Sequence, residues 1–274
     1  MNLIDKKKLM YLEPGDRRAG LCSYVMQVIA MAKPCKDNNM PMYIDFSKDM
    51  LYHKQEDPNG NVWDYFFEQP FPNLNLNDYE LERAVWYQDN RPWNPPMRFD
   101  SKSDYLKVAR QLCREFVKLK PELTTVGDKF IQENTNGRFL SVHKRGCDHE
   151  NRNQFRLEHY FIETDKHIDK FDKLLVCSDE QHSVDAFKQR YGSKVFSYSS
   201  HRAQSASEGI VGAHNLPNSN NFVYQNGYDC LVEAYMMSRS SFLLKTVSNV
   251  TSFAVMNSDD LDFIWIDANY GCNY

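Results

Sequence analysis

The second half of the chain alternates short apolar stretches, polar loops and helical stretches in a regular order, and this order constrains the fold more than any other feature. The predicted strands are Phe139–Val142, Lys173–Cys177, Lys194–Tyr198, Phe242–Leu244 and Leu261–Ile266. The helices predicted between them are Gln154–Thr164, Ser183–Tyr191, Tyr228–Ser238 and Asn249–Met256, and Gly192 is the predicted C-cap of the second. Strands that alternate with helices form a mostly parallel sheet with helices on both faces, so the predicted fold class is α/β.

The start of the chain predicts a β–α–β unit of its own. Met10–Leu12 and Pro41–Phe46 are the predicted strands, and Leu21–Ala32 is a predicted helix that ends at Pro34. The loop before this helix contains glycines, which can bring backbone N–H groups close to a phosphate or a sugar. Gly20 is therefore a candidate binding residue, although a simple tight turn explains it equally well.

The middle of the chain is less regular. Tyr52–Pro96 is rich in Asn, Asp, Pro and Trp, and it predicts long loops with short helices. This stretch forms either one wall of a binding site, on the side of an acceptor substrate, or an ordinary insertion packed on the first domain. Ser103–Lys118 is a predicted amphipathic helix. A turn at Thr135–Arg138 separates two predicted domains, residues 1–135 and residues 136–274.

Polar side chains follow three of the predicted strands at their carboxyl ends. They are His143 and Arg145 after the first strand, Ser178 and Asp179 after the second, and Thr246, Ser248 and Thr251 before the helix that starts at Asn249. In an open parallel sheet, ligands bind outside the carboxyl ends of the strands, so we expect one shared cleft. Two structural interpretations stay open: His143 can be a structural histidine, and Asp179 with Glu180 can cap the next helix.

A diphosphate is the ligand that these residue types fit. The start of a helix offers unpaired backbone N–H groups and a positive dipole end, and a hydroxyl of Thr246 or Ser248 adds a donor. Arg145 adds a planar guanidinium that can bind phosphate oxygens in bidentate fashion. The alternatives are that Thr246 and Ser248 only cap the helix, and that Arg145 pairs with Asp148 or Glu150 on the surface.

Composition and missing motifs exclude several functional classes. The net charge of −4 provides no electrostatic footprint for nucleic acid or an anionic membrane. The seven cysteines include no Cys-x-x-Cys pair, which disfavours a zinc site and a disulfide framework and fits a reducing compartment. No apolar run reaches the roughly 20 residues needed to span a bilayer, and no signal peptide is recognisable, so we expect a cytoplasmic protein.

Motifs for common cofactors are also missing from the sequence. It contains no G-x-x-x-x-G-K-[ST] loop, no G-x-G-x-x-G fingerprint and no G-x-S-x-G elbow. We therefore expect neither a metal nor an organic cofactor, with cationic side chains neutralising a leaving phosphate. The aromatic share of 14% fits either sugar-binding surfaces or ordinary core packing.

Three motifs in the second half resemble those of a fucosyltransferase superfamily, which includes α-1,6-fucosyltransferases, nodulation-factor fucosyltransferases and protein O-fucosyltransferases. His143-x-Arg145-x-x-Asp148 resembles their His-x-Arg-x-x-Asp strand end. Leu174–Glu180 is similar to their strand that ends in "ATDD". Glu233–Ser238 followed by Phe242–Val250 resembles their "D…LS…FL..T.SS.V" segment. The resemblance is good over residues 138–255 and looser over the first 50 residues.

This resemblance implies a GT-B-like fold, with two Rossmann-like domains facing a cleft. It implies an inverting, metal-independent glycosyltransferase that moves a sugar from a nucleotide diphosphate donor to a hydroxyl of an oligosaccharide or glycoprotein acceptor. Residues 1–135 would be the acceptor-side domain and residues 136–274 the donor-binding domain.

The roles implied by the resemblance can be assigned residue by residue. Arg145 would bind the diphosphate, with His143 and Asp148 in the same pocket and Thr246 and Ser248 near the phosphates. Asp179 would lie near the nucleotide and Glu233 near the base or ribose.

Two departures from the family pattern leave alternatives open. Relatives with a catalytic carboxylate after the Arg motif carry it where this chain has Arg152 or Asn153, so Asp148 or Glu150 would serve as the base. One serine of the family's Ser-Ser pair is Asn249 here. Two donor classes thus stay open, a GDP sugar such as GDP-fucose and a UDP sugar such as UDP-xylose. A non-catalytic sugar- or nucleotide-binding protein is the remaining alternative.

Overall fold

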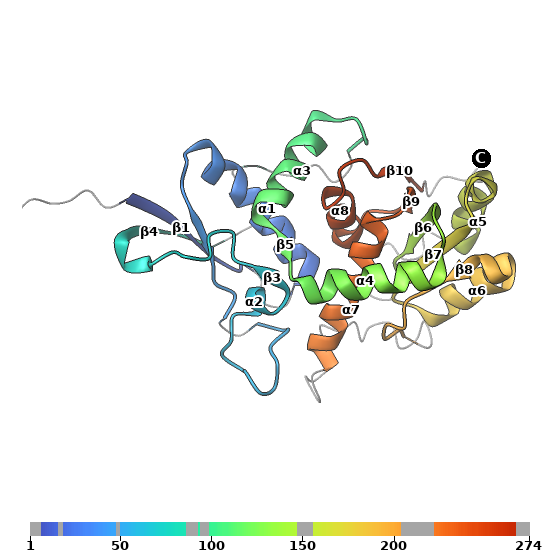
Figure 1. Ribbon diagram of the computed structural model, residues 1–274, viewed down its shortest axis with the longest axis horizontal. Coiled ribbons are helices and arrows are strands. Elements are labelled where there is room, and N and C mark those ends of the chain that lie inside the picture. Colours follow the sequence, from blue (N-terminus) through green and yellow to red (C-terminus); the bar gives the residue numbers. More distant parts are fainter. Residues whose placement is uncertain are drawn as a thin grey trace, which may run out of the picture. The chain divides into compact units, whose positions relative to one another are not determined.

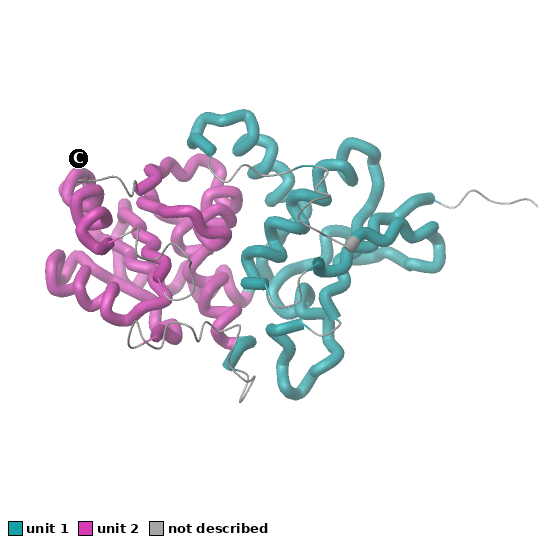
Figure 2. The backbone as a smooth tube through the Cα atoms, turned by 180° about the vertical axis from the view of Figure 1, so that it is seen from behind, with its two compact units in different colours: residues 1–121, 218–224 teal, residues 122–217, 225–274 magenta. Residues whose placement is uncertain are grey.

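The computed structural model describes residues 7–15, 19–47, 50–85, 93, 99–146, 156–203 and 222–266. The chain divides into two compact units, which Figure 2 shows in different colours. Unit 1 contains residues 1–121 and 218–224, and unit 2 contains residues 122–217 and 225–274.

Unit 2 is built on a parallel sheet of five strands, in the order β10-β9-β6-β7-β8. The strands are β6 (Phe139–Lys144), β7 (Lys173–Ser178), β8 (Val195–Phe196), β9 (Phe242–Lys245) and β10 (Asp262–Trp265). The chain runs outward from β6 through β7 to β8, then returns to the other side of β6 for β9 and β10. This order places a topological switch point between β6 and β9, where ligands of doubly wound folds bind.

Helices cover both faces of this sheet (Figure 1). They are α4 (Pro121–Asn134), α5 (Leu157–His167), α6 (Gln181–Tyr191), α7 (Phe222–Ser238) and α8 (Asn249–Met256), with short 3-10 turns at Ile168–Lys170 and Gly192–Lys194. On one face, Tyr160 of α5 and Phe187 of α6 pack on Val142, Val176 and Leu244, all fully buried. The apolar strands are therefore covered on both sides, as a parallel sheet requires, and the predicted α/β fold class is confirmed.

Unit 1 contains a smaller parallel sheet of three strands in the order β2-β1-β4. Its strands are β1 (Lys7–Glu13), β2 (Met42–Ile44) and β4 (Tyr79–Val85). Its other elements are α1 (Leu21–Asp37), α2 (Val62–Phe66), a 3-10 turn η1 (Leu76–Asp78), α3 (Asp104–Phe116), and the antiparallel pair β3 (Phe67–Glu68) and β5 (Lys118–Leu119). The β1–α1–β2 order confirms the β–α–β unit predicted at the start of the chain.

Several predicted boundaries are wrong, for identifiable reasons. Helix α1 continues through Pro34 to Asp37, because the carbonyl of Pro34 still accepts a hydrogen bond from Asn38 N (3.1 Å) near the end of the helix. Strand β4 was predicted as irregular chain, since its sequence YELERAV is too polar to suggest a strand in a parallel sheet. Strand β6 extends to Lys144, so His143 lies inside the strand and not in the loop after it.

Other local predictions are confirmed. Helix α8 has the predicted bounds, Asn249–Met256. The helix predicted at Ser103–Lys118 is α3 (Asp104–Phe116), and the Ser103 hydroxyl caps it by accepting from Leu106 N (3.3 Å). Gly192 ends α6 with φ of 57°, a left-handed conformation that favours glycine.

Truncating Phe187 tests the core between α6 and the sheet. Phe187→Ala should lower the free energy of unfolding by about 3–5 kcal/mol, because it leaves a cavity in a fully packed site. Ile162→Ala on α5 is the control, since Ile162 is 41% exposed, and it should change stability by only about 0.5 kcal/mol. Urea denaturation of both variants measures the difference, and equal losses would show that this core is not packed as described.

Candidate functional site

The carboxyl ends of β6, β7 and β9 meet at one edge of the sheet in unit 2. The register pairs Val142 with Val176 and with Leu244, so the three strands end within a few residues of one another. Arg145 and Gly146 follow β6, Asp179 follows β7, and Thr246 follows β9. The site is therefore built from loops that are distant in sequence and adjacent in the fold.

The loops after β6 and β7 are joined by hydrogen bonds and an ion pair. Gly146 N donates to the Asp179 carboxylate (2.8 Å). The Lys144 ammonium forms an ion pair with Glu180, and both side chains are buried. The carboxylate of Glu180 also accepts from Ser183 Oγ (3.0 Å). Arg145 thus lies between two residues that are bound to the β7 loop.

Tyr160 of α5 links the ends of β6 and β9. Its hydroxyl lies 3.4 Å from Thr246 Oγ1 and accepts a hydrogen bond from the backbone of Arg145. Burial raises the pKa of the Tyr160 hydroxyl, and the nearby charges of Asp179 and Glu180 raise it further. The phenol is therefore neutral at physiological pH and acts as a hydrogen-bonding spacer between the two loops.

The start of α8 is held by its own polar side chains. Ser248 is the N-cap residue, and its hydroxyl accepts from Val250 N (3.3 Å). The Thr251 hydroxyl donates to the carbonyls of Thr246 (3.3 Å) and Ser248 (3.0 Å), which fixes the loop between β9 and the helix. Ser248 thus caps the helix, as one of the two interpretations of this residue predicts. Capping is compatible with an anion bound at this helix start.

A buried arginine brings Glu233 of α7 to the same edge. Arg202 donates to the backbone carbonyls of Ser178 (3.0 Å), Ser200 (3.2 Å) and Tyr198 (2.7 Å) and to Glu233 Oε1 (3.0 Å). The Ser200 hydroxyl donates to the same carboxylate oxygen (2.7 Å). Burial raises the pKa of Glu233 to about 7, although the positive charge of Arg202 opposes the rise.

Lys245, the last residue of β9, is fully buried against aromatic rings of β10. Its ammonium lies 4.1 Å from the ring centre of Trp265 and 5.1 Å from that of Phe263. Cation–π contacts stabilise the charge, but they do not replace hydration completely. Burial accordingly lowers the pKa of Lys245 to about 7.

The structure brings six of the candidate residues to this edge of unit 2: His143, Arg145, Asp179, Glu233, Thr246 and Ser248. Gly20 lies in unit 1 as the N-cap residue of α1, where Leu21 N donates to the Tyr52 hydroxyl (3.2 Å). Its φ of −64° is open to any residue, so no backbone strain explains the glycine. Asp148 and Glu150 lie outside the described residues.

Lys144, Tyr160 and Arg202 also belong to the site, and the sequence analysis did not identify them. Lys144 is the unspecified residue in His143-x-Arg145, and it ends β6 two residues beyond the predicted strand end at Val142. Tyr160 falls on the apolar face of a helix, where an aromatic residue usually indicates core packing. Arg202 follows β8 in a long polar stretch that has no recognisable pattern.

The described residues contain neither a cluster that could bind a metal ion nor a helix that could span a membrane. No group of three or more His, Cys, Asp or Glu side chains among them is arranged to hold a metal ion. Within the same residues, every helix is too short or too polar to cross a membrane.

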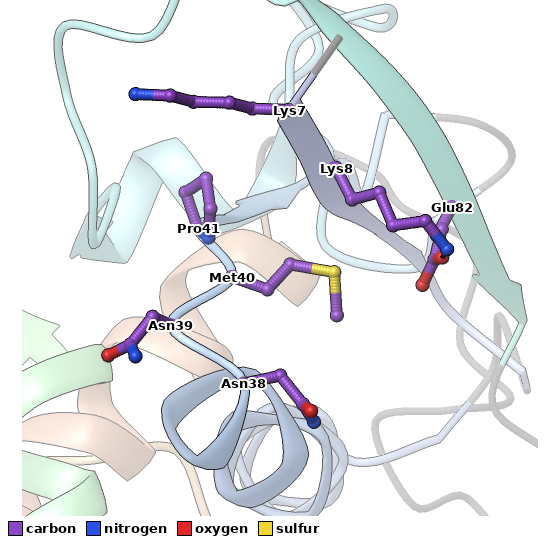
Figure 3. A pocket seen from close by; sticks show the side chains of 7 residues that line it. All are labelled: Lys7, Lys8, Asn38, Asn39, Met40, Pro41 and Glu82. Carbon is purple, nitrogen blue, oxygen red and sulfur yellow. Dashed lines mark hydrogen bonds and ion pairs between the residues drawn. The ribbon is translucent and has the colours of Figure 1, made fainter. Parts of the chain in front are cut away.

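A surface pocket in unit 1 lies toward the amino ends of β1 and β2 (Figure 3). It is lined by Lys7 and Lys8 at the start of β1, by Asn38–Pro41 before β2, and by Glu82 of β4. Lys8 and Glu82, on the neighbouring strands β1 and β4, form an ion pair at one side of it. Because ligands of parallel sheets bind at the carboxyl ends of the strands, this pocket does not belong to the same kind of site.

Comparisons with solved structures find the same fold in fucosyltransferases. The NodZ α-1,6-fucosyltransferase soaked with GDP-fucose has a TM-score of 0.56 and 17% identity, over 92% of this chain and 93% of NodZ. POFUT1 in complex with GDP has a TM-score of 0.53 and 10% identity, over 96% of this chain and 99% of POFUT1. A mutant of Arabidopsis thaliana FUT1 in complex with GDP has a TM-score of 0.55 and 10% identity, over 95% of this chain and 70% of FUT1.

Neither a protein-family model nor a curated protein matches the sequence itself. At 10–18% identity, the structural similarity establishes the fold. The expected resemblance to the GT-B-type fucosyltransferases is therefore confirmed at the level of architecture.

Replacing Lys245 tests whether the buried amine is neutral. The folded pKa of about 7 lies below the unfolded value of 10.5, so the unfolded state binds more protons between these pH values. Wild-type stability should therefore rise by about 1 kcal/mol per pH unit from pH 7 to 9 relative to Lys245→Met. Lys129→Met, at an exposed position on α4, is the control for removing a charge. A Lys245→Met difference that is constant with pH would show that the folded state keeps the amine charged.

Proposed function

We propose that the protein is a glycosyltransferase that moves a sugar from a nucleotide diphosphate donor to a glycan hydroxyl. The observation that carries this proposal is the convergence of Arg145, Asp179 and Thr246 at the switch point of the unit 2 sheet. The fold shared with fucosyltransferases solved with GDP or GDP-fucose supports the same ligand class.

Arg145 and the start of α8 are assigned to the diphosphate. The reaction is proposed to be inverting: the acceptor oxygen attacks the anomeric carbon, the bond from that carbon to the phosphate oxygen breaks, and the nucleoside diphosphate leaves. Negative charge then develops on the leaving phosphate. A guanidinium held at this position lowers the barrier by preorganised electrostatics, and N–H groups at the start of a helix add to it. We propose that these groups act without a metal ion.

The remaining assignments follow the same geometry. His143, Thr246 and Ser248 line the phosphate side, and Asp179 lies near the nucleotide. Glu233 is assigned to the base or ribose, since a buried carboxylate can accept N–H or O–H donors.

The acceptor side of the proposal rests on two further assignments. The proton of the acceptor hydroxyl goes to a carboxylate, Asp148 or Glu150. Residues 1–135, including Gly20, are assigned to the acceptor, and an oligosaccharide or glycoprotein is the proposed acceptor class. The donor is proposed to be GDP-fucose, with a UDP sugar such as UDP-xylose as the second candidate.

A thermal-shift series with nucleotides tests the donor assignment. GDP at about 100 times its Kd should stabilise the protein by about 2.7 kcal/mol, since a ligand that binds only the folded state stabilises it by mass action. UDP at the same concentration should give a smaller shift. A larger shift with UDP would move the donor to the UDP sugars, and no shift with either would contradict a nucleotide-sugar site. Stabilisation without any transfer or donor hydrolysis would indicate a binding protein.

Substitution of Arg145 tests the mechanism. Arg145→Ala should lower kcat by about 10²–10³, which is the usual effect of removing one donor that acts on developing charge. Arg145→Lys should restore little, because the planar fork is lost. Arg138→Ala is the matched control, since Arg138 precedes the same strand at its opposite end and contacts the Phe171 ring. Near-normal turnover of both Arg145 variants would remove this residue from the mechanism.

A further inference from the structure

We propose that Glu180, through its buried pair with Lys144, is a positioning residue that fixes the Arg145–Gly146 turn for donor binding. The inference rests on the proposed function, since it assigns a role to residues around Arg145. Its structural part can be measured independently of any activity.

The side chain of Glu180 does not cap α6, although Glu180 is at the N-cap position of that helix. The carboxylate instead contacts the Lys144 ammonium and accepts from Ser183 Oγ (3.0 Å), with His182 Nε2 at 3.6 Å. The side chains of Lys144 and Glu180 are 7% and 6% exposed. A carboxylate that is buried and bound in this way has little freedom to move.

Gly146 packs directly against this carboxylate. A Cβ atom built on Gly146 would lie 2.0–2.2 Å from the carboxylate carbon and oxygens of Glu180. Such an overlap is tolerable only where the neighbouring side chain can swing aside, and Lys144 and Ser183 hold this one. On the same turn, Gly146 N donates to Asp179 (2.8 Å), and Glu180 N donates to Ser178 Oγ (3.1 Å).

Arg145 is consequently flanked on both sides by anchored residues. The Lys144 side chain pairs with Glu180. The Gly146 N–H binds Asp179, and Gly146 also packs against the Glu180 carboxylate. These partners all lie in the segment 178–180. A catalytic group must be held within a fraction of an ångström, and its support is supplied by neighbouring buried contacts. The buried pair therefore supplies rigidity to the turn, whatever its net contribution to stability.

A double-mutant cycle with Arg145 tests this role. Glu180→Gln should lower kcat/KM by about tenfold or more, mainly through kcat, because a displaced Arg145 loses transition-state contacts. In the Arg145→Ala background the same change should have less than about a threefold effect, since the residue that it positions is gone. Asp165→Asn, which removes the exposed ion pair with Arg190 (2.5 Å) between α5 and α6, is the control and should leave kcat/KM unchanged. Equal effects of Glu180→Gln in both backgrounds would overturn the proposal.

A second variant keeps the test valid if Glu180→Gln folds poorly. Removal of one partner leaves a buried charge uncompensated, whereas removal of both partners is usually tolerated. Lys144→Met/Glu180→Met should therefore keep a melting temperature close to wild type and still show the loss of turnover. Wild-type turnover in this folded double variant would contradict the positioning role.

Amide hydrogen exchange separates this inference from the proposed function. In the double variant, exchange at the Arg145 and Gly146 amides should accelerate at least about tenfold, while the amides of α6 beyond its first turn keep their rates. If exchange at these amides accelerates but the wild type transfers no sugar, the positioning role of Glu180 is correct and the proposed function is wrong. If their exchange rates are unchanged, the positioning role is wrong whether or not the protein is a transferase.

Discussion

The candidate site depends on one constraint, which is that β6, β7 and β9 run parallel and end at the same edge of one sheet. Parallel pairing aligns the carboxyl ends of these strands, and the strand order reverses between β6 and β9, which is where doubly wound folds bind their ligands. Three hydrogen bonds then fix the spacing of the loops: Gly146 N donates to Asp179, the Arg145 backbone donates to the Tyr160 hydroxyl, and the Tyr160 hydroxyl donates to Thr246. The chemistry of the site is a consequence of this arrangement.

Burial of charge distinguishes the surroundings of this edge from the rest of the described chain. Two ion pairs, Lys144–Glu180 and Arg202–Glu233, are almost entirely enclosed, while the other described ion pairs leave at least one partner well exposed. Buried pairs contribute little net stability because desolvation offsets the attraction. Their value here is geometric: each connects an element that carries a candidate ligand-binding residue to a neighbouring strand end.

Much of the architecture could be predicted from the sequence, because buried parallel strands are apolar and their helices are amphipathic. Asn249–Met256 was predicted with its correct bounds. Strand β4 was missed because its glutamates and arginine conceal a strand that pairs on one side only. Helix α1 was ended too early because a proline inside a helix can weaken or kink it without ending it, and α1 continues for three residues after Pro34.

The candidate residues themselves could be located by motif and strand order, but their partners could not. Nothing in the local sequence indicates that Glu180 forms an ion pair with Lys144. Nor does it indicate that Arg202 donates hydrogen bonds to three backbone carbonyls and to Glu233. The Lys144–Glu180 and Arg202–Glu233 pairs arise from tertiary packing between residues that are 36 and 31 positions apart. Sequence reasoning therefore finds the residues at a sheet edge more readily than the network that supports them.

The central claim is that a nucleotide diphosphate binds at the edge of unit 2 where β6 and β9 end. A crystal structure of the protein grown with GDP tests it most directly. The account predicts that the diphosphate lies within hydrogen-bonding distance of the Arg145 guanidinium and of backbone N–H groups at the start of α8, near Thr246 and Ser248. A GDP bound elsewhere, with this edge empty, would contradict the account.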